Sequence, residues 1–372
     1  MPGFHWHPAT RIIGPAPDLT ALCHAVQGGH GLRCGRDGVV THPGSDLLCE
    51  TSGSSGVPKV IRRSVASWQA SFAVNGAALD LGPQTCVAVF SGFGASLALY
   101  GALEGAHHGA ALVSLAGVAP GAWAGRVAAS GTTTLYITPT QAALLCAAGR
   151  VLPFVQHILV GGGTLPPATE AMARAACPQA RLIQFYGAAE TSFVTWTDAA
   201  TPPGSVGRAY PGVTLRLDDD GLIGVRSPYL FTDYASGDSA LTCWSDGFLS
   251  VGEVGRLDTD GHLYILGRRD RMVTVADHNV HPEAAEACLA RLAPAARAVV
   301  VAVPDALRGA RLVACLSGPT QGLTDADLLR ACRAALGSHA APHRLLRLAA
   351  LPMLPSGKPD LVALTKLAGH AA

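Results

Sequence analysis

The segment Thr51–Lys59 (TSGSSGVPK) combines hydroxyl side chains, glycines and a lysine between two short apolar runs. Backbone N–H groups and hydroxyls exposed in such a loop suit a polyphosphate. The candidate phosphate-binding residues are Thr51, Ser52, Gly53, Ser54, Ser55, Gly56 and Lys59. The segment is not a Walker A loop, because Pro58-Lys59-Val60 stands where that loop needs Gly-Lys followed by Ser or Thr. A loop of this composition is more often a plain connector, so both interpretations stay open.

Two further loops carry candidate ligands. The stretch 161–167 (GGGTLPP) follows one apolar run, and 185–192 (FYGAAETS) includes the end of the next. Together with 51–59, these would be three loops that leave the carboxyl ends of strands, and such loops meet at one crevice of an open α/β sheet, where ligands usually bind. Tyr186 could stack on a base there, and the Glu190 carboxylate could hold a metal ion. A solvated or helix-capping carboxylate is the plainer interpretation of Glu190 taken alone.

The elements that must position these loops follow a clear pattern. Strand-like and helix-like runs alternate from Asp46 to Gly187, which predicts an α/β fold with helices covering a largely parallel sheet. After Ser205, period-2 runs around DDG and DG turns predict a subdomain of β-hairpins. Residues 1–45 are expected to form a partly irregular lead-in with at most short elements.

The last hundred residues predict a separate compact α+β unit. It contains a helix that begins at Pro282, two apolar strands, and a helix over 325–336 capped by Thr324. An exposed loop, PMLPSGKPD, comes near the end of the chain. The boundary to the preceding part is expected near Asp270.

The order of the motifs is more specific than any one of them. TSGSSGVPK, GGGTLPP, FYGAAET, SVGRAYPG, GEVGRLDTDGHLYILGRRD and PSGKPD follow one another as in the adenylate-forming superfamily. From about residue 46 to its end, the chain therefore resembles acyl-CoA synthetases, adenylation domains of peptide synthetases and luciferases. The resemblance implies a large α/β domain over 1–269, with mixed, largely parallel sheets and a hairpin-rich subdomain. It also implies a small, mobile α+β domain over 270–372.

The resemblance implies a nucleotide site built from the same motifs. Residues 51–59 would hold the β- and γ-phosphates of ATP, Tyr186 would stack on the adenine, and Glu190 would bind Mg²⁺. Glu253 would bind the ribose hydroxyls in place of the family's usual Asp. The remaining implied ligands are Gly161, Gly162 and Gly163 at the adenine and acyl pockets, Gly187 and Ala189 beside Tyr186, and Arg268 at the ribose or phosphates.

Lys358 matches the family's catalytic lysine, and Asp270 matches the hinge between the two domains. A mobile ammonium stabilises the negative charge that builds up as a carboxylate attacks the α-phosphate. The implied reaction converts a small carboxylic acid and ATP to acyl-AMP and pyrophosphate, and then forms a thioester with CoA. Two alternatives stay open: an adenylating enzyme that loads the phosphopantetheine thiol of an acyl carrier protein, and a catalytically decayed binding or scaffold homologue.

Several positions depart from the family pattern. Ala189 replaces a Thr that usually faces the α-phosphate, and Ser91 falls near a His or aromatic position of the acyl pocket. Thr274 replaces a common Lys, and Asp277 replaces a Gly beside the thiol tunnel, where a carboxylate could narrow the path or repel a pantetheine arm. The section before Thr51 is short for the family, so a homodimer or a partner protein could complete it.

Composition limits the possible partners. The formal net charge is +1, with 49% apolar and 14% charged residues, which is typical of a globular chain without a nucleic-acid partner. No apolar run is long enough to predict a membrane span, and the first residues do not have the pattern of a secretory signal. Ten cysteines without a C-x-x-C pair predict buried thiols and a cytoplasmic location.

Overall fold

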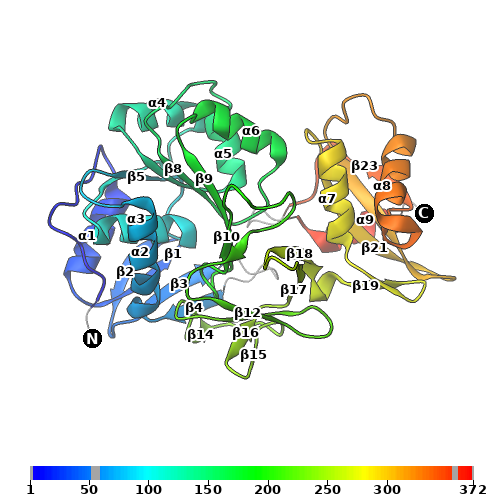
Figure 1. The fold of residues 1–372 in the computed structure, drawn as a ribbon, viewed down its shortest axis with the longest axis horizontal. Helices are drawn as coiled ribbons and strands as arrows, with labels where there is room; N and C mark the ends of the chain where they lie inside the picture. The colour runs from blue at the N-terminus through cyan, green and yellow to red at the C-terminus, as the bar shows by residue number, and fades with distance from the viewer. Residues whose placement is uncertain (1–2, 52–58, 354–358, 371–372) are drawn as a thin grey trace.

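The computed structural model describes residues 3–51, 59–353 and 359–370 (Figure 1). A seven-stranded sheet with the order β11-β10-β9-β8-β7-β5-β6 forms the centre of the larger part. Its strands are β5 (Cys86–Val89), β6 (Ala111–Ser114), β7 (Thr134–Ile137), β8 (His157–Val160), β9 (Arg181–Tyr186), β10 (Thr195–Trp196) and β11 (Arg208–Ala209). Strands β5 to β9 pair in parallel, which confirms the expected α/β sheet.

Helices cover both faces of this sheet (Figure 1). They are α2 (Val65–Leu79), α3 (Ser96–His107), α4 (Pro120–Ser130), α5 (Pro139–Cys146) and α6 (Pro167–Ala176). Val87 and Val89 of β5 lie in one apolar cluster with α2 and α3, whereas Cys86 and Ala88 lie in a second cluster with α4, α5 and α6. Successive side chains of a strand point to opposite faces, so a fully buried strand is apolar throughout.

A second sheet, ordered β14-β4-β3-β1-β2, carries both ends of the candidate phosphate loop, so this loop does not leave the parallel sheet as expected. Its strands are β1 (Gly31–Gly35), β2 (Gly38–His42), β3 (Leu47–Thr51), β4 (Lys59–Arg63) and β14 (Asp233–Ser236). Helix α1 (Pro17–Gln27) precedes β1 and buries Leu19 and Leu22 completely. The lead-in is therefore more regular than expected, because β1 joins this sheet as the parallel neighbour of β3.

Hairpins follow, as the Asp-Gly turns predicted. They comprise β12 (Thr214–Leu217), β13 (Ile223–Arg226), β15 (Cys243–Ser245), β16 (Phe248–Ser250), β17 (Glu253–Leu257) and β18 (Leu263–Arg268). Gly221 and Gly261 have φ of 78° and 81°, the left-handed backbone that a tight turn needs.

The C-terminal part packs its own core. After the 3-10 turn η1 (Arg269–Arg271) come β19 (Val273–Val275), β20 (His278–Val280), α7 (Pro282–Leu292), β21 (Arg297–Asp305), β22 (Gly309–Ser317), α8 (Asp325–Ala340), β23 (Arg344–Arg347) and α9 (Leu361–His370). Thr324 and Asp327 form the capping box at the start of α8, which confirms the predicted cap. The sheet β21-β22-β23 lies between two apolar clusters, with α7 and α8 on one face and α9 on the other. The sequence pattern did not predict α4, the β19–β20 hairpin, β23 or α9.

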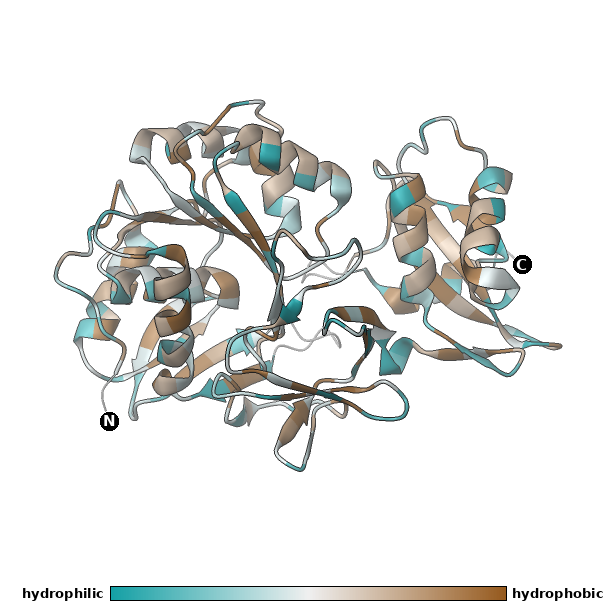
Figure 2. Ribbon diagram, viewed as in Figure 1, coloured by the Kyte–Doolittle hydropathy of each residue, from teal (hydrophilic) through white to brown (hydrophobic). Residues whose placement is uncertain are grey.

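Apolar residues concentrate on the strands and on the helix faces turned toward them (Figure 2). Within the described residues, no helix is long and apolar enough to cross a membrane. All ten cysteines are free thiols, and Cys243 is the only one of them that is exposed.

Candidate active site

The ends of the candidate phosphate loop lie face to face. Thr51 of β3 pairs with Lys59 of β4 across the antiparallel ladder, so the intervening loop begins and ends at one point of the sheet edge. The candidates Ser52, Gly53, Ser54, Ser55 and Gly56 lie outside the described residues. The Lys59 ammonium lies 5.6 Å from the centre of the Tyr234 ring. The ring face is therefore close enough to attract this ammonium.

The loop after β9, which carries Glu190, is held from beneath by Arg63. The Arg63 guanidinium has no exposed surface and donates to the carbonyl oxygens of Ala189 at 2.6 Å and Tyr229 at 2.5 Å. Burial lowers the pKa of Arg63 to about 10, against the raising influence of Cys49 and Glu190, so the side chain stays charged at neutral pH. A buried charge is tolerated because it is hydrogen-bonded to backbone acceptors.

The same loop is compact by itself. Gly187 is required, because a Cβ atom at this position would lie 1.7 Å from the backbone oxygen of Ser192. Trp68 Nε1 donates to Ser192 Oγ at 2.9 Å, and the backbone N–H of Phe231 donates to the Glu190 carbonyl at 2.8 Å. These bonds fix the backbone that carries the Glu190 carboxylate.

The Glu190 carboxylate is half-buried and is bound by a tyrosine. Tyr234 donates its hydroxyl proton to Glu190 Oε1 at 2.7 Å, and Thr242 Oγ1 lies 2.8 Å from the same hydroxyl. Burial raises the pKa of Tyr234 to about 12, so the hydroxyl keeps its proton at neutral pH.

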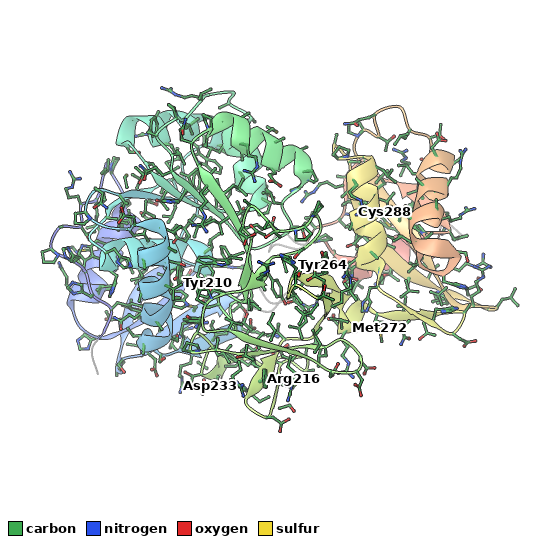
Figure 3. The ribbon with its side chains drawn as sticks, in the orientation of Figure 1. Tyr210, Arg216, Asp233, Tyr264, Met272 and Cys288 are labelled. Atoms are coloured by element: carbon green, nitrogen blue, oxygen red, sulfur yellow. The ribbon has the colours of Figure 1, made fainter. Side chains whose placement is uncertain are left out.

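A second group of side chains lies at the end of β9. Tyr186 donates a hydrogen bond from its hydroxyl to Glu253, and Glu253 is paired with Arg268 in the β17–β18 ladder. Burial, together with the Glu253 charge, raises the pKa of Tyr186. Tyr264 lies on the same hairpin, in the middle of the molecule (Figure 3).

The glycines predicted to line the adenine and acyl pockets follow β8 and lie beside this group. Gly161 is buried, and a Cβ atom there would lie 2.1 Å from the Phe185 ring of the neighbouring strand β9. Gly162 has φ of 82° and is exposed, as is Gly163. The loops after β8 and β9 therefore leave the same sheet edge, as the sequence predicted.

The structure thus brings the described candidates together in two neighbouring groups. One contains Thr51, Lys59, Glu190 and Ala189, and the other contains Gly161, Tyr186, Gly187, Glu253 and Arg268. Ala189 packs its methyl group against the adjacent apolar cluster. Lys358 lies outside the described residues; Met353 and Pro359, on either side of its segment, pair as an isolated bridge.

Contacts also join the two parts of the chain. Arg268 Nε donates to Asp270 Oδ1 at 3.0 Å, and the Arg268 backbone N–H donates to Glu283 of α7 at 3.2 Å. Arg271 forms a two-pronged ion pair with Glu286 of the same helix. Met272 follows at the point where the chain passes into the C-terminal part (Figure 3).

A magnesium ion that arrives with a nucleotide fits this donor set. The described residues contain no cluster of three or more His, Cys, Asp or Glu side chains that could hold a metal without help. Mg²⁺ retains several waters and is usually held by one or two carboxylates together with substrate phosphates. The single Glu190 carboxylate, which Tyr234 joins to Lys59, meets that requirement.

Sequence reasoning did not find two of the residues that build the site. Arg63 lies on β4, four residues after Lys59. Alternate residues of a strand point to the same face of the sheet, so this spacing could have predicted that Arg63 and Lys59 share a face. Tyr234 lies on β14, which pairs with β4 from far along the chain, and no local signal marks it.

Comparisons with known proteins agree with this geometry. The family model for the AMP-binding enzyme matches residues 46–234, and that for the AMP-binding enzyme C-terminal domain matches residues 284–358. The chain belongs to the AMP-binding enzyme family.

Individual relatives are more distant. The chain is 29% identical over 321 residues to an uncharacterized acyl–CoA ligase, YhfT, from Bacillus subtilis, in a match that covers 83% of this chain and 65% of YhfT. It therefore spans just under two thirds of the length of that curated relative.

Two solved structures share the fold. The amide bond synthetase McbA from Marinactinospora thermotolerans has a TM-score of 0.76 at 25% identity, covering 88% of this chain and 70% of McbA. The o-succinylbenzoate CoA synthetase from Bacillus subtilis, in complex with its acyl-adenylate intermediate, has a TM-score of 0.76 at 22% identity, covering 86% of this chain and 68% of that one.

Proposed function

We propose that this chain activates a carboxylic acid with ATP and then forms a thioester with CoA. The observation that carries the proposal is the meeting of three elements at the loop after β9: the loop carries Glu190, Tyr234 joins that carboxylate to Lys59 of β4, and Tyr186 at the end of β9 bonds to Glu253 of β17. A cation, a carboxylate for Mg²⁺, and an aromatic ring beside a second carboxylate are the groups that a magnesium nucleotide requires. Membership of the AMP-binding enzyme family supports the same assignment.

In the first step, a carboxylate oxygen of the acid attacks the α-phosphorus of ATP. The bond from the α-phosphorus to the bridging oxygen breaks, and pyrophosphate leaves. Glu190 would hold a Mg²⁺ ion, whose charge would neutralise that of the leaving group. Tyr186 would stack on the adenine, Glu253 and Arg268 would hold the ribose, and Lys59 would bind the leaving phosphates. Preorganised charges at the developing anion lower the barrier.

In the second step, the CoA sulfur attacks the acyl carbon, and AMP leaves as the thiol loses its proton. The resemblance to an acyl–CoA ligase supports CoA as the acceptor. A phosphopantetheine thiol on an acyl carrier protein offers the same sulfur and is the alternative acceptor.

The division into 1–269 and 270–372 belongs to this proposal. Lys358 would reach the α-phosphate from the smaller part, and Asp270 would absorb the backbone change when that part rotates. A second copy of the chain or a partner protein at the acyl pocket, and a cytoplasmic location, remain predictions. The mass in solution would test the first of these.

Pyrophosphate release against a panel of carboxylic acids tests the proposal. We expect release that depends on both acid and Mg²⁺, and its absence with every acid while ATP still binds would support the decayed-homologue alternative. Lys358→Ala should nearly abolish pyrophosphate release, because about 3 kcal/mol or more of transition-state stabilisation is lost. ATP binding should stay nearly intact. Lys366→Ala, on the exposed face of α9, is the matched control and should leave release unchanged. Equal rates for the two variants would remove Lys358 from the mechanism.

A further inference from the structure

Tyr234 lies between the two oppositely charged groups of the phosphate side of the site. Its hydroxyl donates to Glu190 Oε1 at 2.7 Å, while the Lys59 ammonium lies 5.6 Å from the centre of its ring. One side chain therefore contacts both the candidate metal ligand and the candidate phosphate ligand.

Strand pairing explains this position. Tyr234 of β14 stands opposite Ile61 of β4, so the two side chains share a face of the sheet. Lys59 and Arg63 are each two residues from Ile61 and point to that same face. Asp233, the neighbour of Tyr234, points to the other face, where it pairs with Arg62 at 3.5 Å. Figure 3 labels Asp233, in the lower part of the view.

The hydroxyl groups form a directed chain. Tyr234 has one proton, which it donates to the carboxylate, so the Thr242 hydroxyl 2.8 Å away must donate to the tyrosine oxygen. Hydrogen bonds in such a chain strengthen one another. Thr242 is placed for this by the turn in which its N–H donates to the Ser239 carbonyl.

The ring keeps the two charges available for a ligand. A phenol binds one carboxylate oxygen without cancelling the carboxylate's charge, and a ring face attracts an ammonium without forming an ion pair. Across the described part of the chain, no ion pair joins Lys59 to Glu190. A direct Lys59–Glu190 pair would have to be broken before Mg²⁺ and phosphate could bind.

We propose that Tyr234, supported by Thr242, is a positioning residue for magnesium-bound ATP: its hydroxyl sets the Glu190 carboxylate and its ring sets the Lys59 ammonium. This inference rests on the proposed function for the identity of the ligand. It adds a residue that links the two halves of the phosphate site.

The test measures ATP affinity by titration calorimetry, with Mg²⁺ and with EDTA, in the full chain. Tyr234→Phe keeps the ring and loses the hydroxyl. We expect its affinity for metal-free ATP to equal that of the wild type, and the gain in affinity on adding Mg²⁺ to fall by about tenfold, because a hydrogen bond to a charged group is lost. Thr242→Val should reduce the same gain by a smaller factor.

Tyr234→Leu removes the ring as well, and should also weaken metal-free ATP by roughly two- to fivefold through Lys59. The control is Tyr264→Phe, since Tyr264 also donates to a carboxylate, that of Asp258, and also faces a cation, Arg256. This control should change neither affinity. Thermal unfolding of each variant checks folding, and Thr242→Val carries the test if a Tyr234 variant does not fold.

An unchanged Mg²⁺-dependent gain in Tyr234→Phe or in Thr242→Val would overturn the proposal, as would an equal loss in Tyr264→Phe. The proposed function fails separately. A wild type that binds magnesium-bound ATP but releases no pyrophosphate with any acid contradicts the activity and leaves the role of Tyr234 measurable.

Discussion

The Tyr186 hydroxyl donates its hydrogen bond to the Glu253 carboxylate, although the two residues belong to different sheets. The proposed adenine-stacking ring and the proposed ribose ligand are therefore one coupled unit. Tyr186→Phe keeps the ring and removes the donor, so ATP affinity should fall by about three- to tenfold. The double variant with Glu253→Gln should show a coupling of about 1 kcal/mol in a calorimetric cycle. Strictly additive losses would show that the two side chains act independently.

Gly187 sets the shape of the loop that carries Glu190. Gly187→Ala places a Cβ atom 1.7 Å from the Ser192 carbonyl oxygen, so the loop must move and ATP binding should drop more than tenfold. Overpacking of this kind costs about 1–3 kcal/mol of unfolding free energy. Gly125→Ala in α4, which has open space, is the control and should unfold at the same denaturant concentration or higher. Normal ATP affinity in Gly187→Ala would refute the role of this backbone.

Gly237 lies against the stem of Lys59. It has φ of 73°, and a Cβ atom there would lie 3.2 Å from Lys59 Cγ. Gly237→Ala should therefore displace the ammonium and raise the KM for ATP several-fold. Gly204→Ala has the same backbone strain, with φ of 83°, but meets nothing within 4 Å. The free energy of unfolding should fall by a similar amount in both variants, about 1 kcal/mol. Only Gly237→Ala should raise the KM for ATP. Identical KM values would mean that Lys59 is not displaced.

Glu104 is fully buried in a polar network beneath the parallel sheet. It accepts hydrogen bonds from Asn75 at 2.9 Å, Tyr100 at 2.9 Å and Tyr136. Burial raises its pKa from 4.5 to about 7, against the lowering influence of these donors. The folded chain thus binds more protons than the unfolded chain between these two pH values, so this contribution to stability is fully present below the lower pKa and is lost as the pH rises through the higher one.

Denaturant unfolding from pH 4.5 to 7 checks this sign. The Glu104 contribution should decline by about 3 kcal/mol across the window, and Glu104→Gln should remove that decline. Glu170→Gln, which breaks an exposed ion pair on α6, should leave the wild-type slope in place. A Glu104→Gln slope equal to the wild-type slope would contradict a neutral carboxyl at this site.

Asp277 lies exposed in the turn between β19 and β20, with φ of 65°. Glycine adopts this backbone without strain, so Asp277→Gly should not destabilise the chain. If the carboxylate narrows the path of the thiol or repels it, this variant should form the CoA thioester faster, with unchanged pyrophosphate release. Asp277→Asn keeps the size and removes the charge, which separates the two causes. A slower or equal thioester rate in Asp277→Gly would show that this interpretation of the loop is wrong.

Most of the fold could be predicted from local patterns. The strands β5, β7 and β8 are short apolar runs because both of their faces are covered. Such runs allowed the parallel sheet to be predicted from the sequence. Helix α4 was not predicted, because Gly121 and Gly125 dilute its helical pattern. The hairpin β1–β2 was underestimated because its strands owe their stability to pairing with β3, which is not a local property.

The site was predictable where a motif carries its own geometry. The loops after β3, β8 and β9 were found because glycines, hydroxyls and a Tyr-Gly pair stand where strands end. Tyr234 and Arg63 were not found, because their roles depend on how two sheets face each other. Arg63 bonds to Tyr229, 166 positions away in the chain, and Tyr234 bonds to Glu190, 44 positions away, so neither contact leaves a local sequence pattern.

The buried Arg63 guanidinium has a consequence for how this site could change in evolution or in design. Arg63 lies on β4, the strand that follows the candidate phosphate loop, and donates to the backbone oxygen of Ala189, next to Glu190. A substitution that shifts either sheet would separate this buried positive charge from its hydrogen-bond acceptors. The two halves of the pocket must therefore vary in step, so grafting only one of them from a relative should give a chain that folds poorly.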